Sequence, residues 1–466
     1  VSELGRVHFT GIGGAGMSGI ARILLARGVP VSGSDAAGSD LLAELAGLGA
    51  TVSVGHAASQ VAGADTLVVS TAIRPDNPEL TEASRRGLRV LHRSAALASA
   101  MLGRRGVAIA GTHGKTTTTS MLTTILWSCG ADPSYVIGGI LSGTGLGAAD
   151  GSGGIFVAEA DESDGSFLNL APDAAIVTCV EADHLDNYSG LAEIEATFLA
   201  FVGRIQPGGI LLTCADDPGS AKLAAAAAGL DLKLRSYGTA AGADYQVSGI
   251  VPRGMATELT VTPGPRAPLP PGRALPVRIS VPGRHNALNA AAALAMAAEL
   301  GVPADQAVAG LAAYGGARRR MEVKGEADGV RVLDSYAHHP TELAADLAAA
   351  RDVAAGGQVI AVFQPHLFSR TRLFATEFGA ALGLADEALV LDIYAAREDP
   401  EPGVTGELVA RAVPGGAMFL PDRAQLPAAV AGLAKPGDLV LTMGAGDITQ
   451  LGPLIVAELA ARAQAG

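Results

Sequence analysis

Short apolar segments alternate with longer segments of helical periodicity along the first hundred residues. Strands are predicted at 6–11, 29–35, 66–72 and 88–93, and helices over 13–28 and 40–50. Strands that alternate with helices are typical of a parallel, doubly wound sheet. The chain therefore opens with a predicted Rossmann-like domain, and residues 102–106 are the expected linker that ends it.

A second strand–loop–helix unit is predicted from residue 106 to residue 130. Further buried strands are predicted at 155–161, 174–180 and 208–214. Residues 240–282 are rich in proline and alternate between apolar and polar positions, which is typical of antiparallel strands at the edge of a sheet. An alanine-rich helix is expected from His285 to Leu300.

The alternation of strands and helices resumes after the segment 315–321, which has the sequence GGARRRM. Strands are predicted at 330–336, 358–366, 387–394 and 438–447. The fold class is therefore α/β with three domains, at 1–104, 105–316 and 317–466, of which the first and the third are Rossmann-like.

Composition narrows the class of protein further. Hydrophobic residues make up 49% of the chain, which is ample for packed cores and excludes a disordered chain. The formal net charge of −13 disfavours nucleic acid as a partner. No apolar run approaches the roughly 20 residues that span a bilayer, and no signal peptide is evident. We expect a cytoplasmic protein without membrane contact, either a monomer or a weak homodimer.

The three cysteines, Cys129, Cys179 and Cys214, are widely separated in the sequence. They form no C-x-x-C pair, so the sequence predicts reduced cysteines and neither a disulfide framework nor a zinc site.

The strongest chemical motif is Gly-Thr-His-Gly-Lys-Thr-Thr at 111–117, between an apolar strand and a helix. Glycines expose N–H donors to a phosphate chain, and the helix N-terminus favours its negative charge. Lys115 is suited to the β- and γ-phosphates, and the Thr116 hydroxyl to Mg²⁺. Ile109 stands where the first glycine of the usual P-loop spacing belongs. We interpret the central domain as a P-loop mononucleotide-binding domain.

Acidic residues and a histidine follow two other predicted strands of the central domain. The acidic run 159–164 follows one strand directly, and the Asp-His-Leu-Asp sequence at 183–186 follows the next. Carboxylates at the carboxyl end of a strand beside a P-loop are suited to a metal that bridges phosphates. The alternatives are a solvated acidic loop and a structural histidine.

The N-terminal residues Gly11–Gly16 match G-x-G-x-x-G after a strand, and Asp35 follows at the end of the next strand. This pattern favours a pyrophosphate-binding loop. Spacing alone leaves NAD, FAD and a nucleoside-diphosphate sugar equally open.

Polar residues also gather near predicted helix starts and strand ends later in the chain. Asn286 and Asn289 share one helical face, where their amides could pair with adenine or cap the helix. The segments 334–340 and 364–370 each follow an apolar strand, and strand carboxyl ends are where α/β folds bind ligands.

Taken together, these motifs resemble the Mur ligase family, and the alanine-adding branch of it most closely. The segments that carry the resemblance span nearly the whole chain, at 8–21, 111–119, 159–167, 181–188, 283–293, 335–342, 363–371 and 444–448. The resemblance implies that L-alanine is ligated to the carboxylate of UDP-N-acetylmuramate with ATP and Mg²⁺, in peptidoglycan synthesis. It resolves the ligand of the first domain as a UDP-sugar.

The resemblance also implies residue roles. Lys115, Glu159 and His184 are the expected catalytic residues, with Thr116, Glu159 and His184 at the metal. The expected ATP-binding residues are Gly111, Thr112, His113, Gly114, Lys115, Thr116, Thr117, Asn286, Asn289, Arg320 and Asp334. The expected UDP-sugar-binding residues are Gly11, Gly13, Gly14, Gly16, Ser34, Asp35 and Ser70. Tyr336, His338 and Arg370 are expected in the amino-acid site, and the domains are expected to close by a hinge near residues 315–320.

The sequence departs from the family pattern at three positions. Ser335 follows Asp334 where many relatives have a second Asp, Met321 follows Arg320 where an aromatic residue is common, and Leu367 replaces an arginine found in some members.

Three alternatives remain at this stage: a murein-peptide ligase that adds a tripeptide to the same nucleotide, a dinucleotide-dependent oxidoreductase, and a P-loop ATPase or binding module without group transfer.

Overall fold

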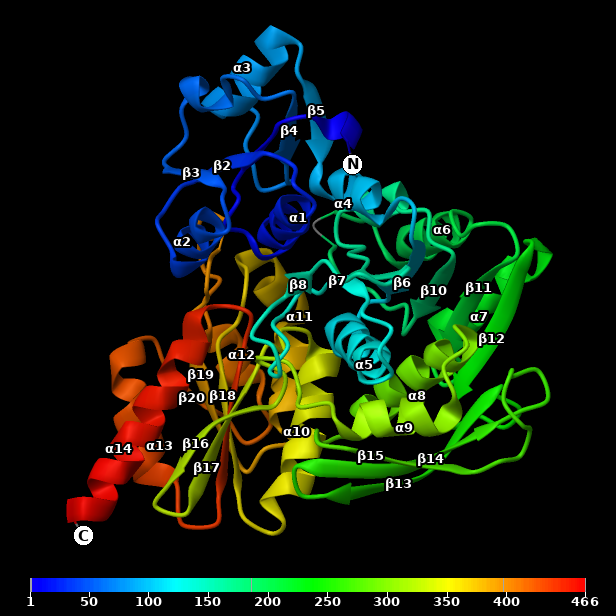
Figure 1. The fold of residues 1–466 in the computed structure, drawn as a ribbon. Helices are drawn as coiled ribbons and strands as arrows, with labels where there is room; N and C mark the ends of the chain where they lie inside the picture. Colours follow the sequence, from blue (N-terminus) through cyan, green and yellow to red (C-terminus); the bar gives the residue numbers. More distant parts are fainter. Residues whose placement is uncertain (1, 186, 397, 466) are drawn as a thin grey trace. The chain divides into compact units, whose positions relative to one another are not determined.

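The computed structural model describes residues 2–185, 187–396 and 398–465, and it has a mixed α/β architecture with three sheets (Figure 1). The chain divides into two compact units. The first comprises residues 1–247, 261–275 and 289–313, and the second comprises 248–260, 276–288 and 314–466. The structure confirms the predicted fold class, and each unit is described by itself below.

The N-terminal sheet has five strands in the order β3-β2-β1-β4-β5, and all of its pairings are parallel. The strands are β1 (Val7–Thr10), β2 (Val31–Asp35), β3 (Thr51–Val54), β4 (Thr66–Val69) and β5 (Arg89–His92). The helices are α1 (Ala15–Ala26), α2 (Asp40–Gly47), α3 (Pro78–Arg86) and α4 (Arg93–Met101). Because every strand runs the same way, the loops after β1, β2, β4 and β5 all lie at one edge of this sheet.

The central sheet has ten strands in the order β15-β14-β13-β12-β11-β10-β6-β9-β7-β8. They are β6 (Arg105–Ala110), β7 (Ser134–Val136), β8 (Ala148–Ala149), β9 (Ile155–Glu159), β10 (Ala174–Val177), β11 (Gly209–Cys214), β12 (Leu232–Gly238), β13 (Tyr245–Arg253), β14 (Ala256–Pro263) and β15 (Leu275–Ile279). The helices are α5 (Lys115–Ser128), α6 (Leu191–Val202), α7 (Pro218–Ala226), α8 (Arg284–Glu299) and α9 (Ala304–Ala312). β6 pairs in parallel with both β9 and β10, so the loops after these three strands meet at one edge.

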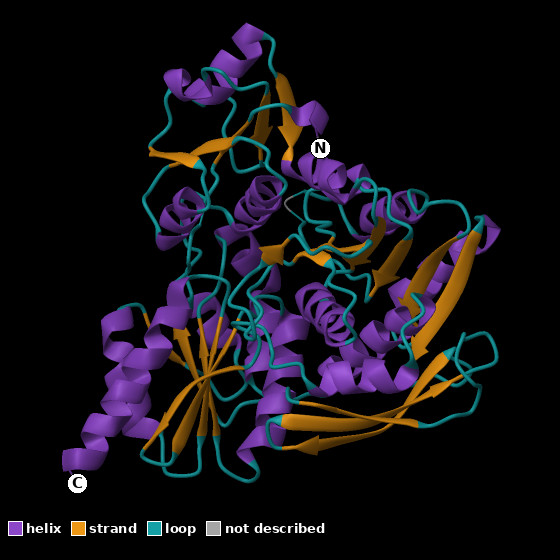
Figure 2. Cartoon of the chain, viewed as in Figure 1, coloured by secondary structure: helices purple, strands orange, loops and turns teal. Residues whose placement is uncertain are grey.

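The third sheet, in the second unit, has six strands in the order β16-β17-β21-β18-β19-β20. They are β16 (Glu322–Ala327), β17 (Val330–Ser335), β18 (Val359–Phe363), β19 (Glu387–Leu391), β20 (Met418–Leu420) and β21 (Leu439–Met443). The helices are α10 (Pro340–Ala354), α11 (Phe368–Leu382), α12 (Glu407–Ala412), α13 (Leu426–Leu433) and α14 (Leu451–Ala465). Helices cover both faces of this sheet, and a separate apolar core lies under each layer (Figure 2).

The predicted linker at 102–106 is wrong at its end, because Arg105 and Gly106 belong to β6. Arg105 pairs with Ile155 of β9, and the backbone N–H of Gly106 donates to Asp173 at 2.7 Å. These pairings lie far apart in the sequence, so local composition could not reveal them. None of the described helices is both long and apolar enough to cross a membrane. All three cysteines are free, as predicted.

Candidate active site

The loop 111–114 links β6 to α5 and turns sharply over the sheet edge. Gly111 has φ +130° and Gly114 has φ +83°, and both values favour glycine. A Cβ at Gly111 would overlap Thr178, and one at Gly114 would lie 2.6 Å from the Asn289 Oδ1. The predicted P-loop therefore needs both glycines, for backbone conformation and for close packing.

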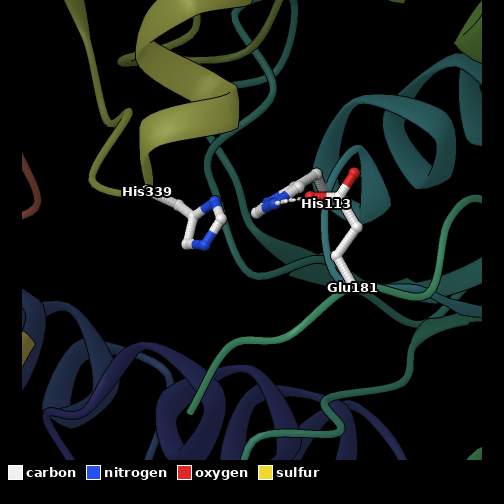
Figure 3. A group of neighbouring side chains, drawn as sticks. All are labelled: His113, Glu181 and His339. Atoms are coloured by element: carbon white, nitrogen blue, oxygen red, sulfur yellow. Dashed lines mark ion pairs between the residues drawn. The ribbon is translucent and has the colours of Figure 1, made fainter. Parts of the chain in front are cut away.

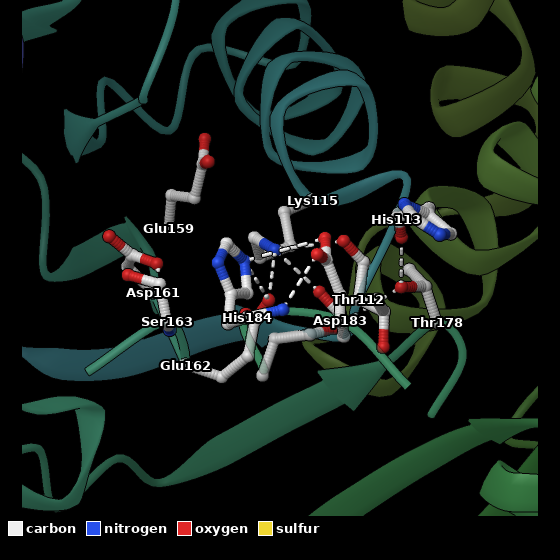
Figure 4. Close-up of polar contacts among 12 residues, drawn as sticks. Thr112, His113, Lys115, Glu159, Asp161, Glu162, Ser163, Thr178, Asp183 and His184 are labelled. Carbon is white, nitrogen blue, oxygen red and sulfur yellow. Dashed lines mark hydrogen bonds and ion pairs between the residues drawn. The ribbon is translucent and has the colours of Figure 1, made fainter. Parts of the chain in front are cut away.

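Lys115 is the first residue of α5, and its ammonium group points back into this loop (Figure 4). Its Nζ donates to the carbonyl oxygens of Gly111 at 2.6 Å and Thr112 at 3.1 Å, and to the Glu162 carboxylate at 2.8 Å. Burial by itself would lower the pKa of Lys115, but nearby carboxylates, Glu162 first, outweigh it and raise that pKa. A cation is thus held at the position where a phosphate chain would meet the helix N-terminus.

Glu162 is the partner that sequence reasoning missed. Its side chain is 4% exposed, and the Tyr188 hydroxyl donates to its backbone carbonyl. Burial raises the pKa of Glu162 to about 7, against the lowering effect of the Lys115 ammonium. The acidic run 159–164 was the available signal, but which of its carboxylates reaches Lys115 depends on how the chain turns after β9.

Thr116 and Glu159 form a second polar cluster. The Thr116 hydroxyl donates to Glu159 Oε1 at 3.1 Å, and the Gly138 N–H donates to Glu159 Oε2 at 2.7 Å. Both Thr116 and Glu159 offer oxygen atoms, which are the ligands that Mg²⁺ prefers. The donor set at this cluster therefore fits a magnesium ion.

His184 lies with Asp183 and Glu162, next to Lys115 (Figure 4). Its Nε2 is 3.6 Å from Asp183 Oδ2 and 3.8 Å from Glu162 Oε1. His184 also has φ +52°, which is uncommon for a residue other than glycine and is often found at functional sites. The predicted metal residues thus occupy two neighbouring clusters, Thr116 with Glu159 and His184 with the lysine pair. Asp186, the last residue of the Asp-His-Leu-Asp motif, lies outside the described residues.

The remaining loop residues bind the segment after β10. Thr112 accepts the backbone N–H of Glu181 at 2.9 Å, and the His113 N–H donates to Cys179 Sγ at 3.2 Å. The His113 ring pairs with the Glu181 carboxylate at 3.7 Å (Figure 3), while Thr117 is 6% exposed within α5. These contacts fix the loop against the sheet edge.

Asn289, on α8, lies beside the loop, where its Oδ1 accepts the Thr118 hydroxyl at 3.2 Å. Asn286 is assigned to the second unit, and its side-chain amide donates to the Pro282 carbonyl at 2.7 Å. Asn286 therefore bonds back onto the turn before its own helix; because its amide donates to a carbonyl, this contact is not an N-terminal cap, which would accept a backbone N–H.

The residues predicted to bind a UDP-sugar surround the loop between β1 and α1. Gly11 to Gly14 form the turn, and Gly16 lies in the first turn of α1. Asp35 accepts the Gly13 N–H at 2.9 Å and thereby closes the loop. The Ser34 hydroxyl is buried and donates to Glu79 at 2.8 Å, whereas Ser70 is partly exposed after β4. The predicted residues do meet at one sheet edge.

In the second unit, Asp334 at the end of β17 is fully buried. It accepts the hydroxyls of Thr442 at 2.9 Å and Thr449 at 2.7 Å and pairs with Arg319 at 3.3 Å. The Arg320 guanidinium lies 5.5 Å from the centre of the Tyr336 ring. Arg319 was not predicted as a site residue, yet it is the arginine that pairs with Asp334.

Tyr336 and His338 are brought together, with ring centres 5.3 Å apart in an edge-to-face arrangement. The His338 ring in turn lies 6.2 Å from that of His366, which stacks on Tyr394. Arg370, in α11, is 6% exposed. Two of the three predicted amino-acid-site residues are thus neighbours, in an aromatic cluster that also includes His366 and Tyr394.

A glycine-rich loop that carries a buried lysine at a helix N-terminus, with carboxylates beside it, is typical of nucleotide-dependent enzymes of the P-loop class. The chain matches three family models: "Mur ligase family, catalytic domain" over residues 6–105, "Mur ligase middle domain" over 109–297, and "Mur ligase, glutamate ligase domain" over 319–446. The chain belongs to the Mur ligase family.

Similar proteins extend over the full length of the chain. The UDP-N-acetylmuramate–L-alanine ligase of Thermobifida fusca is 57% identical, over 98% of this chain and 98% of the relative. That of Kineococcus radiotolerans is 56% identical, over 99% and 98%. The solved structure of the corresponding Thermotoga maritima ligase superposes with a TM-score of 0.80 at 26% identity, covering 99% of both chains. A murein peptide ligase from Psychrobacter arcticus gives 0.70 at 25% identity, covering 98% of both.

Proposed function

We propose that this protein ligates L-alanine to the carboxylate of UDP-N-acetylmuramate and converts ATP to ADP and phosphate. The observation that carries this proposal is the Lys115 ammonium group, fixed at the N-terminus of α5 by the loop carbonyls and Glu162. The relatives at 57% and 56% identity carry the name of that activity. Their similarity extends over all three family-model regions.

A carboxylate is a poor electrophile, because nucleophilic attack would add negative charge to a group that already carries it. In the proposed reaction a carboxylate oxygen of the sugar attacks the γ-phosphorus of ATP, the bond to ADP breaks, and an acyl phosphate forms. The amine of alanine then attacks the acyl carbon, phosphate leaves, and the amine loses a proton. Lys115 stabilises the charge on the phosphoryl oxygens during transfer.

Lys115 must exchange partners for this role. Its ammonium group donates to two carbonyls and one carboxylate. A triphosphate placed over the loop would offer stronger acceptors than the two carbonyls, and Glu162 would keep the ammonium aimed at the loop.

We propose that Thr116 and Glu159 hold Mg²⁺, with His184 as a third ligand. A bound magnesium ion would neutralise part of the phosphate charge. The Gly138 N–H fixes the Glu159 carboxylate by its other oxygen, so this residue is already oriented for a metal. His184 would have to leave its present neighbours, Asp183 and Glu162, to join them.

The sugar nucleotide and alanine are proposed to bind at the other groups of residues that the sequence predicted. We propose that the loop 11–16, with Ser34, Asp35 and Ser70, binds the UDP portion of the sugar nucleotide. Residues 317–466 are proposed to supply Arg320 and Asp334 to ATP, and Tyr336, His338 and Arg370 to alanine. The hinge for domain closure is proposed at residues 315–320.

The test is phosphate release, measured with each substrate omitted in turn. We expect release to require ATP, Mg²⁺, UDP-N-acetylmuramate and L-alanine together. The same rate without the muramyl nucleotide would overturn the ligase proposal. A murein peptide ligase would instead require an alanine-containing tripeptide, an alternative that the curated relatives do not favour.

A further inference from the structure

Arg93 begins α4, directly after β5, at the same sheet edge as the glycine-rich loop 11–16. The loop itself contains no lysine or arginine. β5 lies two places from β1 in a fully parallel sheet, so both connections leave the sheet on one side. Arg93 is therefore in a position to reach the loop from a distant part of the sequence.

The guanidinium of Arg93 lies against that loop. A Cβ built on Gly16 would be 3.2 Å from Arg93 Nη1, a contact that only a side chain close to the loop backbone makes. Arg93 Nη2 donates to Asp161 Oδ2 at 2.7 Å. The Arg93 side chain is 24% exposed and that of Asp161 is 36% exposed, so solvent and ligands reach both.

The place of Arg93 in its helix is electrostatically unfavourable. A cation in the first turn of a helix is repelled by the positive end of the helix dipole. Asp161, which lies 68 residues away in the sequence, offsets this repulsion. The ion pair uses one end of the guanidinium, and an arginine has five N–H donors in a rigid fork, so donors remain to face the loop.

We propose that Arg93 binds a phosphate of the nucleotide sugar at the loop 11–16, and that Asp161 orients the guanidinium for this contact. The proposal rests on the proposed function, because it takes the UDP-sugar to be the ligand of this loop. It gives the loop the cation that its own sequence lacks.

Calorimetric titration of UDP tests the proposal on the full chain, with saturating ADP and Mg²⁺ present to occupy the P-loop. In Arg93→Ala we expect UDP to bind roughly tenfold to a hundredfold more weakly, the usual effect of losing a hydrogen bond between charged groups. Arg93→Lys keeps the charge but not the fork, so its affinity should lie between the two. Uridine, which has no phosphate, should bind the wild type and Arg93→Ala equally in a competition assay.

Arg89→Ala is the matched control. Arg89 begins β5, at the amino end of the strand and so away from the loop 11–16. It is exposed and donates to the Glu3 carbonyl at 2.9 Å, so its loss should leave UDP affinity unchanged. Equal UDP affinity of wild type and Arg93→Ala would overturn the inference, as would an equal loss of uridine affinity, which indicates a structural role. If the wild type itself binds no UDP, the proposed function of the first domain fails instead.

Discussion

Two glycine-rich loops of the first unit follow buried parallel strands, yet they obtain their positive charge in different ways. The loop 111–117 carries its own cation, Lys115, paired with the buried Glu162 at 2.8 Å. The loop 11–16 carries none, and the guanidinium that lies against it, that of Arg93, comes from α4 and pairs with a partly exposed aspartate.

This difference in charge matches the different functions proposed for the two loops. Phosphoryl transfer moves negative charge, so a cation there must lie close and be preorganised in a site sheltered from water. A loop that only binds a pyrophosphate must hold the phosphates in place but does not have to stabilise moving charge. Backbone N–H groups supply most of the hydrogen bonds that hold them.

A buried carboxylate lies next to each loop, but the two carboxylates accept hydrogen bonds from different kinds of partner. Glu162 accepts from a charged lysine, whereas Glu79 behind the first loop accepts the hydroxyls of Thr10 at 2.7 Å and Ser34 at 2.8 Å. Thr10 ends β1 and Ser34 lies in β2, so Glu79 joins the two strand ends that flank the loop. Five substitutions test this comparison.

Lys115→Ala should have the largest effect. It removes the cation of the transfer loop, and we expect phosphate release with all substrates present to fall by about a thousandfold or more. Lys222→Ala is the control, because Lys222 pairs with Glu195 on the surface and should leave the rate unchanged. Turnover near the wild-type rate in Lys115→Ala would remove this lysine from the mechanism.

Glu162→Gln should lower the stability of the nucleotide-free protein. It leaves the buried Lys115 ammonium without its closest carboxylate, which costs about 3 kcal/mol for a buried pair. We expect a fall on the order of 5 °C in the thermal midpoint, and a smaller fall with a non-hydrolysable ATP analogue, whose phosphates replace the lost charge. Glu195→Gln, in an exposed pair, should change little. An equal fall with and without the analogue would contradict this account.

Glu79→Gln should destabilise the protein by about 2 kcal/mol at neutral pH, because a neutral amide oxygen accepts the hydroxyls of Thr10 and Ser34 more weakly than the carboxylate does. Burial would raise the pKa of Glu79, but hydrogen bonds from His8, Thr10 and Ser34 outweigh it and hold the pKa below its ordinary value of 4.5. Since the folded pKa is lowered, this stabilisation is complete above 4.5 and is lost as the pH falls through the folded pKa.

Thermal melting of Glu79→Gln and wild type at pH 7 and at pH 4 measures this dependence. The gap between their midpoints should be wide at pH 7 and narrower in acid. A gap that widens as the pH falls would show that Glu79 is stabilised in its protonated form.

Alanine substitution of a glycine in each loop should have the smallest effects, and these should differ in sign. Gly114→Ala forces a left-handed conformation on alanine, which costs about 1 kcal/mol or more, and it presses on Asn289. Gly16→Ala lies inside α1, where alanine favours the helix by up to about 1 kcal/mol, and its methyl meets only the side chain of Arg93.

We therefore expect a lower melting temperature for Gly114→Ala and an equal or higher one for Gly16→Ala. The second variant should also bind UDP a few-fold more weakly, because the methyl group displaces Arg93. An unchanged UDP affinity in Gly16→Ala would argue against the contact between this guanidinium and the ligand.

Much of the fold could be predicted because periodicity reports local structure. The buried strands β6, β9, β10 and β11 lie where apolar runs predicted them, and Lys115 begins a helix after a glycine loop as its motif indicates. Of the strands that went unpredicted, β7, β8 and β20 have two or three residues each and are too short for a clear pattern, whereas β3, β12 and β16 are longer but mix polar with apolar residues.

The site was predictable only as far as its residues lie within motifs. The pairings of Lys115 with Glu162 and of Arg93 with Asp161 join residues 47 and 68 positions apart, and no spacing rule relates them. His184 was predicted from its motif, but its place beside Glu162 and apart from the Thr116–Glu159 cluster depends on the turn after β10.

By itself the sequence determined the order of strands and helices, the two glycine loops, the lysine of the second loop and the resemblance to a family, because each depends on residues close together in the chain. Tertiary structure alone decided which carboxylate faces which cation. Glu162 reaches Lys115, Glu79 reaches Thr10 and Asp161 reaches Arg93 only because parallel strands bring distant segments to one sheet edge. A charged group that is removed from water there is stable only with a partner beside it.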